Sequence, residues 1–368
     1  MNLKTLSATA LMTLTALASC NEAPKPATSD PEATPQTAAL LANLTTLAAR
    51  GTMIGHQDAL AYGIGWYDET GRCDFRDACG YYPALFGWEV GELELGTEHS
   101  LDSVYFNRIR DYMRWVYAHG GVNTMSWHAR NPLTGGDAWD VSSAEVVGSI
   151  LPGGEKNTLY EEWLDRMADF FNSLKTDEGT PIPVIFRPFH ELTGSWFWWG
   201  RDLCTPEQYI ALWRHTADGL RARGVHNLLW AYSAAGYTSV EELEERYPGD
   251  AYVDIVGFDA YDMLTGGFSD DVRARTALLR EFAAAHHKLP ALTETGSEGL
   301  KNPAWFTEVL YPLLQGQGLS YVMLWRNAHD IPGHFYAAWP GHASASDMTR
   351  LVERDDILTL DEIGNLYE

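Results

Sequence analysis

The stretch that decides the fold is Ile182–Gly200, which reads IPVIFRPFHELTGSWFWWG. Its first five residues form an apolar run of the length of a short buried strand, and His190 and Glu191 follow where that strand should end. Three tryptophans and a phenylalanine come directly afterwards. Because bulky apolar rings disfavour the charged form of a carboxyl group, we expect the pKa of Glu191 to be raised. The stretch therefore places a carboxylic acid beside aromatic rings at the end of a strand.

Strand-like and helix-like segments alternate from about residue 38 onward, which is typical of a parallel α/β architecture. The predicted strands are Thr52–His56, Ala84–Trp88, Gly121–Trp127, Ile182–Pro188, Asn227–Ala231, Asp254–Phe258, Pro290–Thr293 and Tyr321–Trp325. The amphipathic runs between them include Tyr105–His119, Glu161–Leu174, Pro206–Arg223, Asp271–His287 and Pro303–Leu314. With no repeat, linker or second zone of composition, the sequence predicts a single (β/α)8 TIM barrel over residues 38–368.

Polar and aromatic side chains gather where the predicted strands end. They are His56, Gln57, Glu89, Trp127, His128, His190, Glu191, Ser233, Asp259, Tyr261, Glu294, Trp325, Arg326 and Asn327. A packed strand interior has no use for such side chains, whereas the carboxyl-terminal mouth of a barrel is where active sites form. We therefore expect one site at that mouth.

The balance of charge excludes some partners. Acidic residues outnumber basic ones by 50 to 26, and the formal net charge of −24 repels nucleic acid and anionic lipid. The chain has no His-Glu-x-x-His motif, no phosphate-binding loop and no dinucleotide-binding fingerprint. Asp259 and Asp262 would need more ligands than the sequence offers in order to hold a metal ion. We expect no cofactor and no catalytic metal.

The first residues have the character of a targeting segment. Lys4 precedes an apolar run too short for a confident transmembrane helix, and Leu17–Cys20 reads as a lipoprotein signal. This pattern predicts a signal peptide over residues 1–19, a lipid anchor on Cys20 and a flexible tether over residues 20–37. The protein would then be an exported bacterial lipoprotein of the outer membrane, on its periplasmic face or at the cell surface. The alternative is an ordinary secretory signal with an incidental cysteine.

Three cysteines remain after Cys20. Because export implies an oxidising compartment, Cys73 and Cys79 are predicted to form a local disulfide. Cys204 is then left over, and we expect it to be buried.

Two carboxylic acids stand out among the strand-end residues. Glu191 ends the fourth predicted strand and Glu294 ends the seventh, so their side chains can face one another across a barrel mouth. Retaining glycosidases need such a pair at about 5–5.5 Å, one as acid/base and the other as nucleophile. Aromatic faces stack on the apolar faces of sugar rings, and this chain places tryptophans beside Glu191.

The segment from Arg187 to Gly200 resembles that of glycoside hydrolase family 26, whose best-known members are β-mannanases. The resemblance extends over most of residues 40–365. It implies that Glu191 is the acid/base and Glu294 the nucleophile of a retaining hydrolase that cleaves β-1,4-mannosidic bonds in mannan, galactomannan or manno-oligosaccharides. It also implies that Tyr261 hydrogen-bonds the Glu294 carboxylate and that His128 binds the sugar in the reactive subsite.

The remaining site predictions have structural alternatives. His190 is expected to reach the sugar or the nucleophile from the side, unless it is a core histidine. Trp196 and Trp325 are expected to stack on sugars, whereas the adjacent Trp198 and Trp199 suit the core. Arg326 is expected to contact a more distant sugar or to form a structural ion pair.

Other readings stay open at this point. A relative acting on another β-glycan, such as lichenan or β-1,3-xylan, is the alternative enzyme, and a non-catalytic surface glycan-binding protein is the alternative outside catalysis. Endo- and exo-action are both open, because the segments Asp68–Tyr81 and Arg130–Asn157 are candidates for a wall across the cleft. We expect a monomer whose partner is the glycan and whose contact with a membrane is limited to the lipid.

Overall fold

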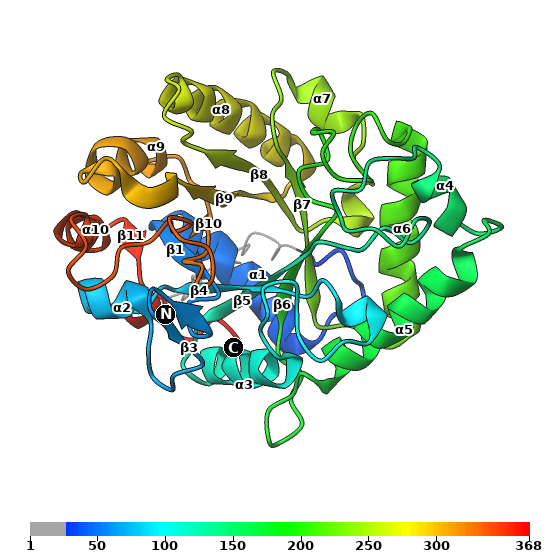
Figure 1. Cartoon of the computed structure of the whole chain (residues 1–368), viewed down its shortest axis with the longest axis horizontal. Coiled ribbons are helices and arrows are strands. Elements are labelled where there is room, and N and C mark those ends of the chain that lie inside the picture. Colours follow the sequence, from blue (N-terminus) through cyan, green and yellow to red (C-terminus); the bar gives the residue numbers. More distant parts are fainter. Residues whose placement is uncertain (1–26) are drawn as a thin grey trace, which may run out of the picture.

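The computed structural model describes residues 27–368, so the predicted signal peptide and Cys20 lie outside the described residues. Within that range, eight parallel strands form a closed barrel with helices around it, which confirms the predicted fold (Figure 1). The strands are β1 (Thr52–Gln57), β4 (Leu85–Glu89), β5 (Val122–Trp127), β6 (Val184–Pro188), β7 (Leu228–Ala234), β8 (Ile255–Tyr261), β9 (Leu289–Gly296) and β10 (Tyr321–Leu324). Each strand pairs with its neighbour in the chain, and pairing of β10 with β1 closes the barrel.

The helices of the outer ring lie near the predicted amphipathic runs, except that the predicted run Pro303–Leu314 is a π-helix (Phe306–Leu310) followed by a four-residue α-helix. The ring includes α3 (Phe106–Ala118), α5 (Asn157–Ser173), α6 (Pro206–Ala222), α8 (Phe268–His286), α9 (Tyr311–Leu314) and α10 (Ala345–Val352). Short elements lie in the connections: α2 (Asp74–Cys79), α4 (Val146–Ile150), α7 (Val240–Glu244), the hairpin of β2 (Tyr62–Gly63) and β3 (Trp66–Tyr67), and β11 (Ile357–Leu358). The start of α6 shows how sequence fixes a boundary. Thr205 and Gln208 form a reciprocal capping box, and Pro206 takes the first helical position.

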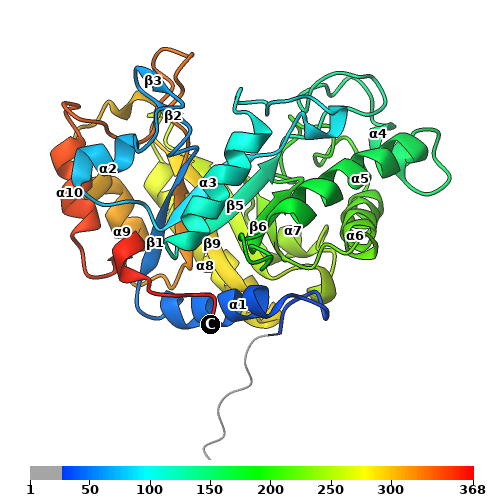
Figure 2. The ribbon, with the colours of Figure 1, turned by 90° about the horizontal axis from the view of Figure 1, so that it is seen from below.

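Helix α1 (Pro35–Ala48) lies across the amino-terminal ends of the strands, and we call this end of the barrel the floor (Figure 2). Its buried side chains join the apolar residues that fill the lower barrel. These are Leu40, Leu41, Leu44 and Leu47 of the helix, packed with Met53, Leu85, Val122, Ile185, Leu229 and Ile255 of the strands. The opposite end, where the strands finish and the loops carry the predicted site, is the mouth. The floor is therefore filled by closely packed apolar side chains.

The ordered domain begins before residue 38, so the predicted tether ends too late in the chain. Ser29 and Asp30 are buried against the barrel, and α1 begins at Pro35 with Thr34 as its N-cap. Thr34 Oγ1 accepts a hydrogen bond from the Thr37 backbone N–H at 3.2 Å. A stretch rich in proline, alanine and threonine suggested disorder, but its second half supplies a helix start.

The predicted Cys73–Cys79 disulfide is wrong. Both cysteines, and Cys204 as well, are free and buried. Cys73 is the N-cap of α2 and Cys79 is its last residue. Six residues of helix separate their Cα atoms by about 9 Å, beyond what a disulfide spans. The Cys79 thiol instead donates to the Phe75 carbonyl oxygen at 3.1 Å. Burial raises the pKa of the Cys79 thiol to about 11, which keeps it protonated.

Candidate active site

Strand β6 carries the first predicted catalytic residue to the mouth, and the backbone changes direction there. The strand ends at Pro188, after which Phe189 and Glu191 adopt positive φ values of 48° and 54°. Such values are uncommon outside glycine and concentrate at functional sites. The backbone thus leaves regular strand geometry at His190 and Glu191, and both side chains belong to the same site.

A bulge in β9 sets the direction of Glu294, the second predicted catalytic residue. Phe258 of β8 lies opposite Leu292, but the next residue, Asp259, lies opposite Glu294, so β9 has one extra residue at Thr293. The Thr293 hydroxyl donates to the Asp259 carboxylate at 2.6 Å. The bulge turns Glu294 into the mouth, where it is 4% exposed and faces the groups of the neighbouring strands.

Glu294 receives donors on both carboxylate oxygens. The Tyr261 hydroxyl donates to Oε2 at 2.6 Å, as the resemblance implied. The Arg187 guanidinium donates to Oε1 and also to Asp259 Oδ2, the latter at 2.9 Å. Charge-assisted hydrogen bonds of this kind hold a carboxylate in one orientation and stabilise its negative charge. Arg187 and Tyr261 thus fix the orientation of the Glu294 side chain.

Glu191 has a different environment. Burial, followed by the negative charge of Glu294, raises the pKa of Glu191 to about 7. The Trp196 indole N–H donates to Glu191 Oε2 at 2.5 Å, and this bond opposes the rise. Glu191 therefore keeps its proton to a higher pH than an ordinary carboxyl group, while Glu294 accepts charge-assisted hydrogen bonds, and this difference fits the separate roles of acid/base and nucleophile.

The two histidines lie between these acids and the rest of the mouth. Glu89 accepts hydrogen bonds from His128 Nδ1 at 2.7 Å and from the His128 backbone N–H at 2.9 Å. Burial lowers the pKa of His128, but the Glu89 carboxylate outweighs it and raises the pKa overall. Burial and the Arg187 charge hold the pKa of His190 well below its usual value. The His190 ring lies edge-on to His128, with ring centres 4.5 Å apart.

Aromatic rings surround this centre, and their exposure separates substrate-facing rings from core rings. Trp196 is 45% exposed, which suits stacking on a sugar. Trp325 follows β10 and lies 6.2 Å from the His128 ring. Trp198 and Trp199 are fully buried, with their indole N–H groups bonded to backbone carbonyls, as expected for core residues.

Arg326 forms the ion pair that the sequence left as its alternative role. Its Nε lies 3.2 Å from Asp102 Oδ1, and its Nη1 donates to the Tyr62 hydroxyl oxygen at 3.3 Å. The Tyr62 hydroxyl in turn donates to Asp58 at 2.7 Å. These contacts fix the guanidinium at the mouth beside Trp325, while its side chain keeps 12% of its surface exposed.

Sequence reasoning gave no role to three residues of this site. Arg187 and Glu89 lie on buried strands, where an unpaired charge is costly. A charged residue inside a predicted strand was therefore the feature of the sequence that could have identified both of them. Trp139 belongs to the segment 130–157, which was suspected only as a wall. Its ring stacks on His128 at 5.2 Å, and it is 45% exposed.

A group of potential metal ligands lies inside the same site. His190, Asp259 and Glu294 bring one ligand atom each to within 4.8 Å of one another. The Arg187 guanidinium already bonds both carboxylates of this group. The guanidinium supplies the positive charge that a cation would otherwise bring.

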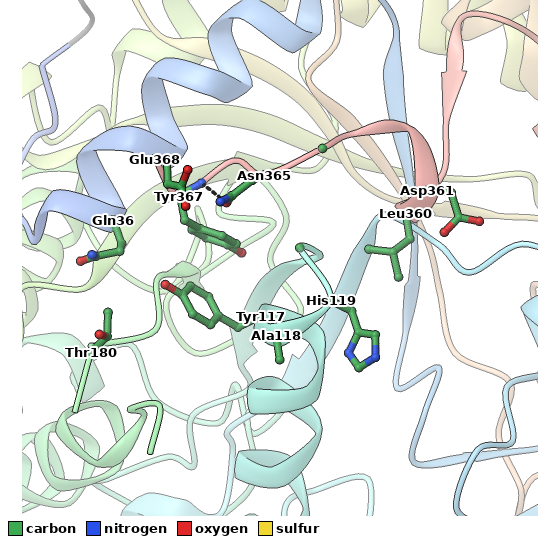
Figure 3. Close-up of a pocket in the computed structure, with 12 residues that line it drawn as sticks. Gln36, Tyr117, Ala118, His119, Thr180, Leu360, Asp361, Asn365, Tyr367 and Glu368 are labelled. Carbon is green, nitrogen blue, oxygen red and sulfur yellow. Dashed lines mark hydrogen bonds between the residues drawn. The ribbon is translucent and has the colours of Figure 1, made fainter. Parts of the chain in front are cut away.

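A separate hollow of about 670 Å³ lies beside the floor (Figure 3). It is lined by Tyr117 and His119 at the end of α3, Gln36 of α1, and Asn365 and Tyr367 near the carboxyl terminus. None of the predicted site residues lines this hollow.

Two solved structures of beta-mannanases have the same architecture as this chain. The solved structure of a GH26 beta-mannanase from Bacteroides ovatus is 47% identical, with a TM-score of 0.90, and the match covers 91% of this chain and 98% of that one. A modular endo-beta-1,4-mannanase from Cellulomonas fimi is 32% identical, with a TM-score of 0.83, over 93% of this chain and 79% of that one.

Curated sequences agree with the structural neighbours. A mannan endo-1,4-beta-mannosidase of Bifidobacterium adolescentis is 31% identical over 87% of this chain, but the match covers only 34% of that protein. The chain spans between about a third and a half of the length of the first curated relatives it matches. The family model for glycosyl hydrolase family 26 matches residues 29–309. The chain belongs to glycosyl hydrolase family 26.

Proposed function

We propose that the protein is a retaining hydrolase of β-1,4-mannosidic bonds in mannan, galactomannan or manno-oligosaccharides. The observation that carries this proposal is the difference between the two carboxyl groups. Glu191 has a pKa of about 7 among aromatic rings, and Glu294 is held between Arg187 and Tyr261. The names of the family members support mannan as the substrate: the Bacteroides ovatus structure is a beta-mannanase, and the Bifidobacterium adolescentis protein is a mannan endo-1,4-beta-mannosidase.

The reaction follows from these positions in two displacements. In the first, Glu294 attacks the anomeric carbon while Glu191 gives its proton to the departing glycosidic oxygen, which leaves a covalent glycosyl-enzyme. In the second, Glu191 removes a proton from water, the water oxygen attacks the anomeric carbon, and the bond to Glu294 breaks. Two inversions restore the β configuration of the product.

The neighbouring residues have supporting roles in this mechanism. Tyr261 and Arg187 orient the nucleophile before attack, and they receive the carboxylate again when the glycosyl bond breaks. His128, held by Glu89, and the neutral His190 face the reactive sugar. Trp325, Trp196 and Trp139 offer apolar faces for the sugar rings on either side.

The test of this proposal is hydrolysis by the chain from residue 27 onward. Purified protein is incubated with linear mannan, galactomannan, lichenan and β-1,3-xylan, and the products are separated over time. We expect manno-oligosaccharides from mannan. Mannobiose from the earliest times would indicate exo-action, and a spread of lengths would indicate endo-action. Cleavage of lichenan or xylan alone would contradict the substrate, and mannan binding without cleavage would contradict catalysis.

We also propose that the protein is exported and held at the outer membrane by a lipid on Cys20. The support is the Leu17–Cys20 signal after an apolar run. None of the helices within residues 27–368 has the length and apolar character to cross a bilayer. Cells given an alkyne fatty acid should label the protein, and Cys20→Ala should remove the label. Equal labelling of both forms, or labelling of neither, would contradict the anchor.

A further inference from the structure

The chain enters the folded domain at the floor, where Asp254 holds it. Asp254 lies just before β8 and is buried. Its carboxylate accepts hydrogen bonds from the Ser29 backbone N–H at 2.6 Å and from the Ser29 hydroxyl at 2.9 Å. It also accepts one from the Trp230 backbone N–H at 2.8 Å. A buried carboxylate with these partners fixes Ser29 to the barrel.

A second set of contacts extends this attachment into α1. His226 Nδ1 lies 2.8 Å from Asp30 Oδ2, and the Thr34 backbone N–H donates to the His226 carbonyl oxygen at 2.8 Å. Helix α1 then packs its leucines into the floor. The first residues of the described domain are thus fixed at the end of the barrel opposite the mouth (Figure 2).

The remaining length of chain decides which way the barrel can face. Nine residue steps separate Cys20 from Ser29, and even a fully extended chain spans at most about 32 Å over that distance. A domain of this length has a radius of gyration of about 20 Å and is therefore about 50 Å across. The connection is too short to pass around the domain from the floor to the mouth.

We propose that the floor is the face that this protein turns toward the lipid headgroups, with the mouth directed away from the bilayer. This inference rests on the proposed anchor at Cys20 for its biological setting, and on the floor attachment for its geometry. A glycan chain that is long or branched then reaches the mouth from the side away from the membrane. The bilayer takes no part in forming or blocking the site.

The orientation is tested by energy transfer to labelled vesicles, with an anchor that does not depend on lipidation. A hexahistidine tag replaces residues 1–20, and the protein is bound to phosphatidylcholine vesicles that contain a nickel-chelating lipid and an acceptor dye on the headgroups. The donor dye is placed at Ala285→Cys or at Met263→Cys. Ala285 is exposed in the last turn of α8 at the floor, and Met263 is 69% exposed just after β8 at the mouth.

We expect several-fold more transfer from the dye at residue 285 than from the dye at residue 263. A matched variant has a Gly/Ser insert of about 40 residues after residue 26, with a root-mean-square length of about 35 Å. Its fully extended length is much greater, so the insert allows the barrel to turn either end toward the vesicle. In that variant the difference should disappear. Equal transfer from both positions with the natural tether, or more from residue 263, would overturn the proposed orientation. Neither outcome depends on whether Cys20 carries a lipid or the mouth cleaves mannan.

Discussion

The floor and the mouth of this barrel are built from the same strands but differ in the side chains that they bury. The floor joins the leucines of α1 to the apolar layer of the strands, and its buried carboxylates, Asp254 and Asp30, hold the entering chain. The mouth buries Arg187, Asp259, Glu294 and His190 together and places Phe189 and Glu191 in strained backbone conformations. Stability is concentrated where the chain is apolar, and chemistry is concentrated where burial of charge and strain is tolerated.

The largest expected effect is at the mouth, from Glu294→Ala. Without the carboxylate no glycosyl-enzyme forms, and we expect kcat to fall by roughly 10⁴- to 10⁶-fold, as for the loss of other enzymatic nucleophiles. Added azide should restore turnover and give an α-glycosyl azide, identified by NMR. The control is Glu298→Ala, an exposed acid just beyond β9 that should keep full activity. Wild-type turnover by the Glu294 variant would remove it from the mechanism.

The second effect concerns the proton of Glu191. A general acid contributes about 10²- to 10⁴-fold, and we expect Glu191→Gln to lose that factor on mannan. In the wild type the donor is protonated below its pKa of about 7, so kcat/KM should fall as the pH rises through that value. In the Gln variant this alkaline limb should be absent. A dinitrophenyl glycoside, whose leaving group needs little protonation, should form the glycosyl-enzyme at near wild-type rate. An unchanged alkaline limb in the variant would assign the titration to another group.

The third prediction moves to the floor and separates stability from activity. Leu44→Ala removes a buried side chain of α1 and should lower the free energy of unfolding by about 2–5 kcal/mol. At temperatures where the variant is folded, kcat should not change, because the mouth is untouched. Thr46→Ala on the exposed side of the same helix is the matched control and should change stability by less than about 0.5 kcal/mol. Urea denaturation and initial rates measure both quantities. A lowered kcat in the folded Leu44 variant would show that floor and mouth are coupled.

The same contrast explains which features the sequence could predict. The alternation of strand-like and helix-like segments predicted the positions of all eight strands. The polar residues at the strand ends predicted that Glu191, Glu294 and Tyr261 lie at one mouth. The role of Arg187 was not predictable by spacing, because its partners Asp259 and Glu294 are distant in the chain. The bulge at Thr293, which sets the direction of Glu294, depends on pairing with both neighbouring strands.

The errors have local physical causes. Cysteine spacing suggested a disulfide, but six residues of helix keep Cys73 and Cys79 apart. The composition before residue 38 suggested a tether, but Asp254 gives Ser29 a buried partner that composition cannot show. In both cases the missing information was a three-dimensional distance.

The smallest expected effect is a shift in the pKa of Glu191, and it tests how one neighbouring side chain at the mouth sets that pKa. Trp196→Phe keeps an aromatic face but removes the indole N–H that bonds Glu191. Because that bond favours the charged carboxylate and so lowers the pKa of Glu191, its loss should raise the pKa. The alkaline limb of kcat/KM should then move to higher pH, with the proton retained over a wider range. Trp139→Phe is the control, since Trp139 stacks on His128 without bonding Glu191, and its alkaline limb should stay in place. A limb that moves to lower pH in the Trp196 variant would mean that water replaces the indole as a better donor. The aromatic ring would then matter for excluding solvent and not for the bond it makes.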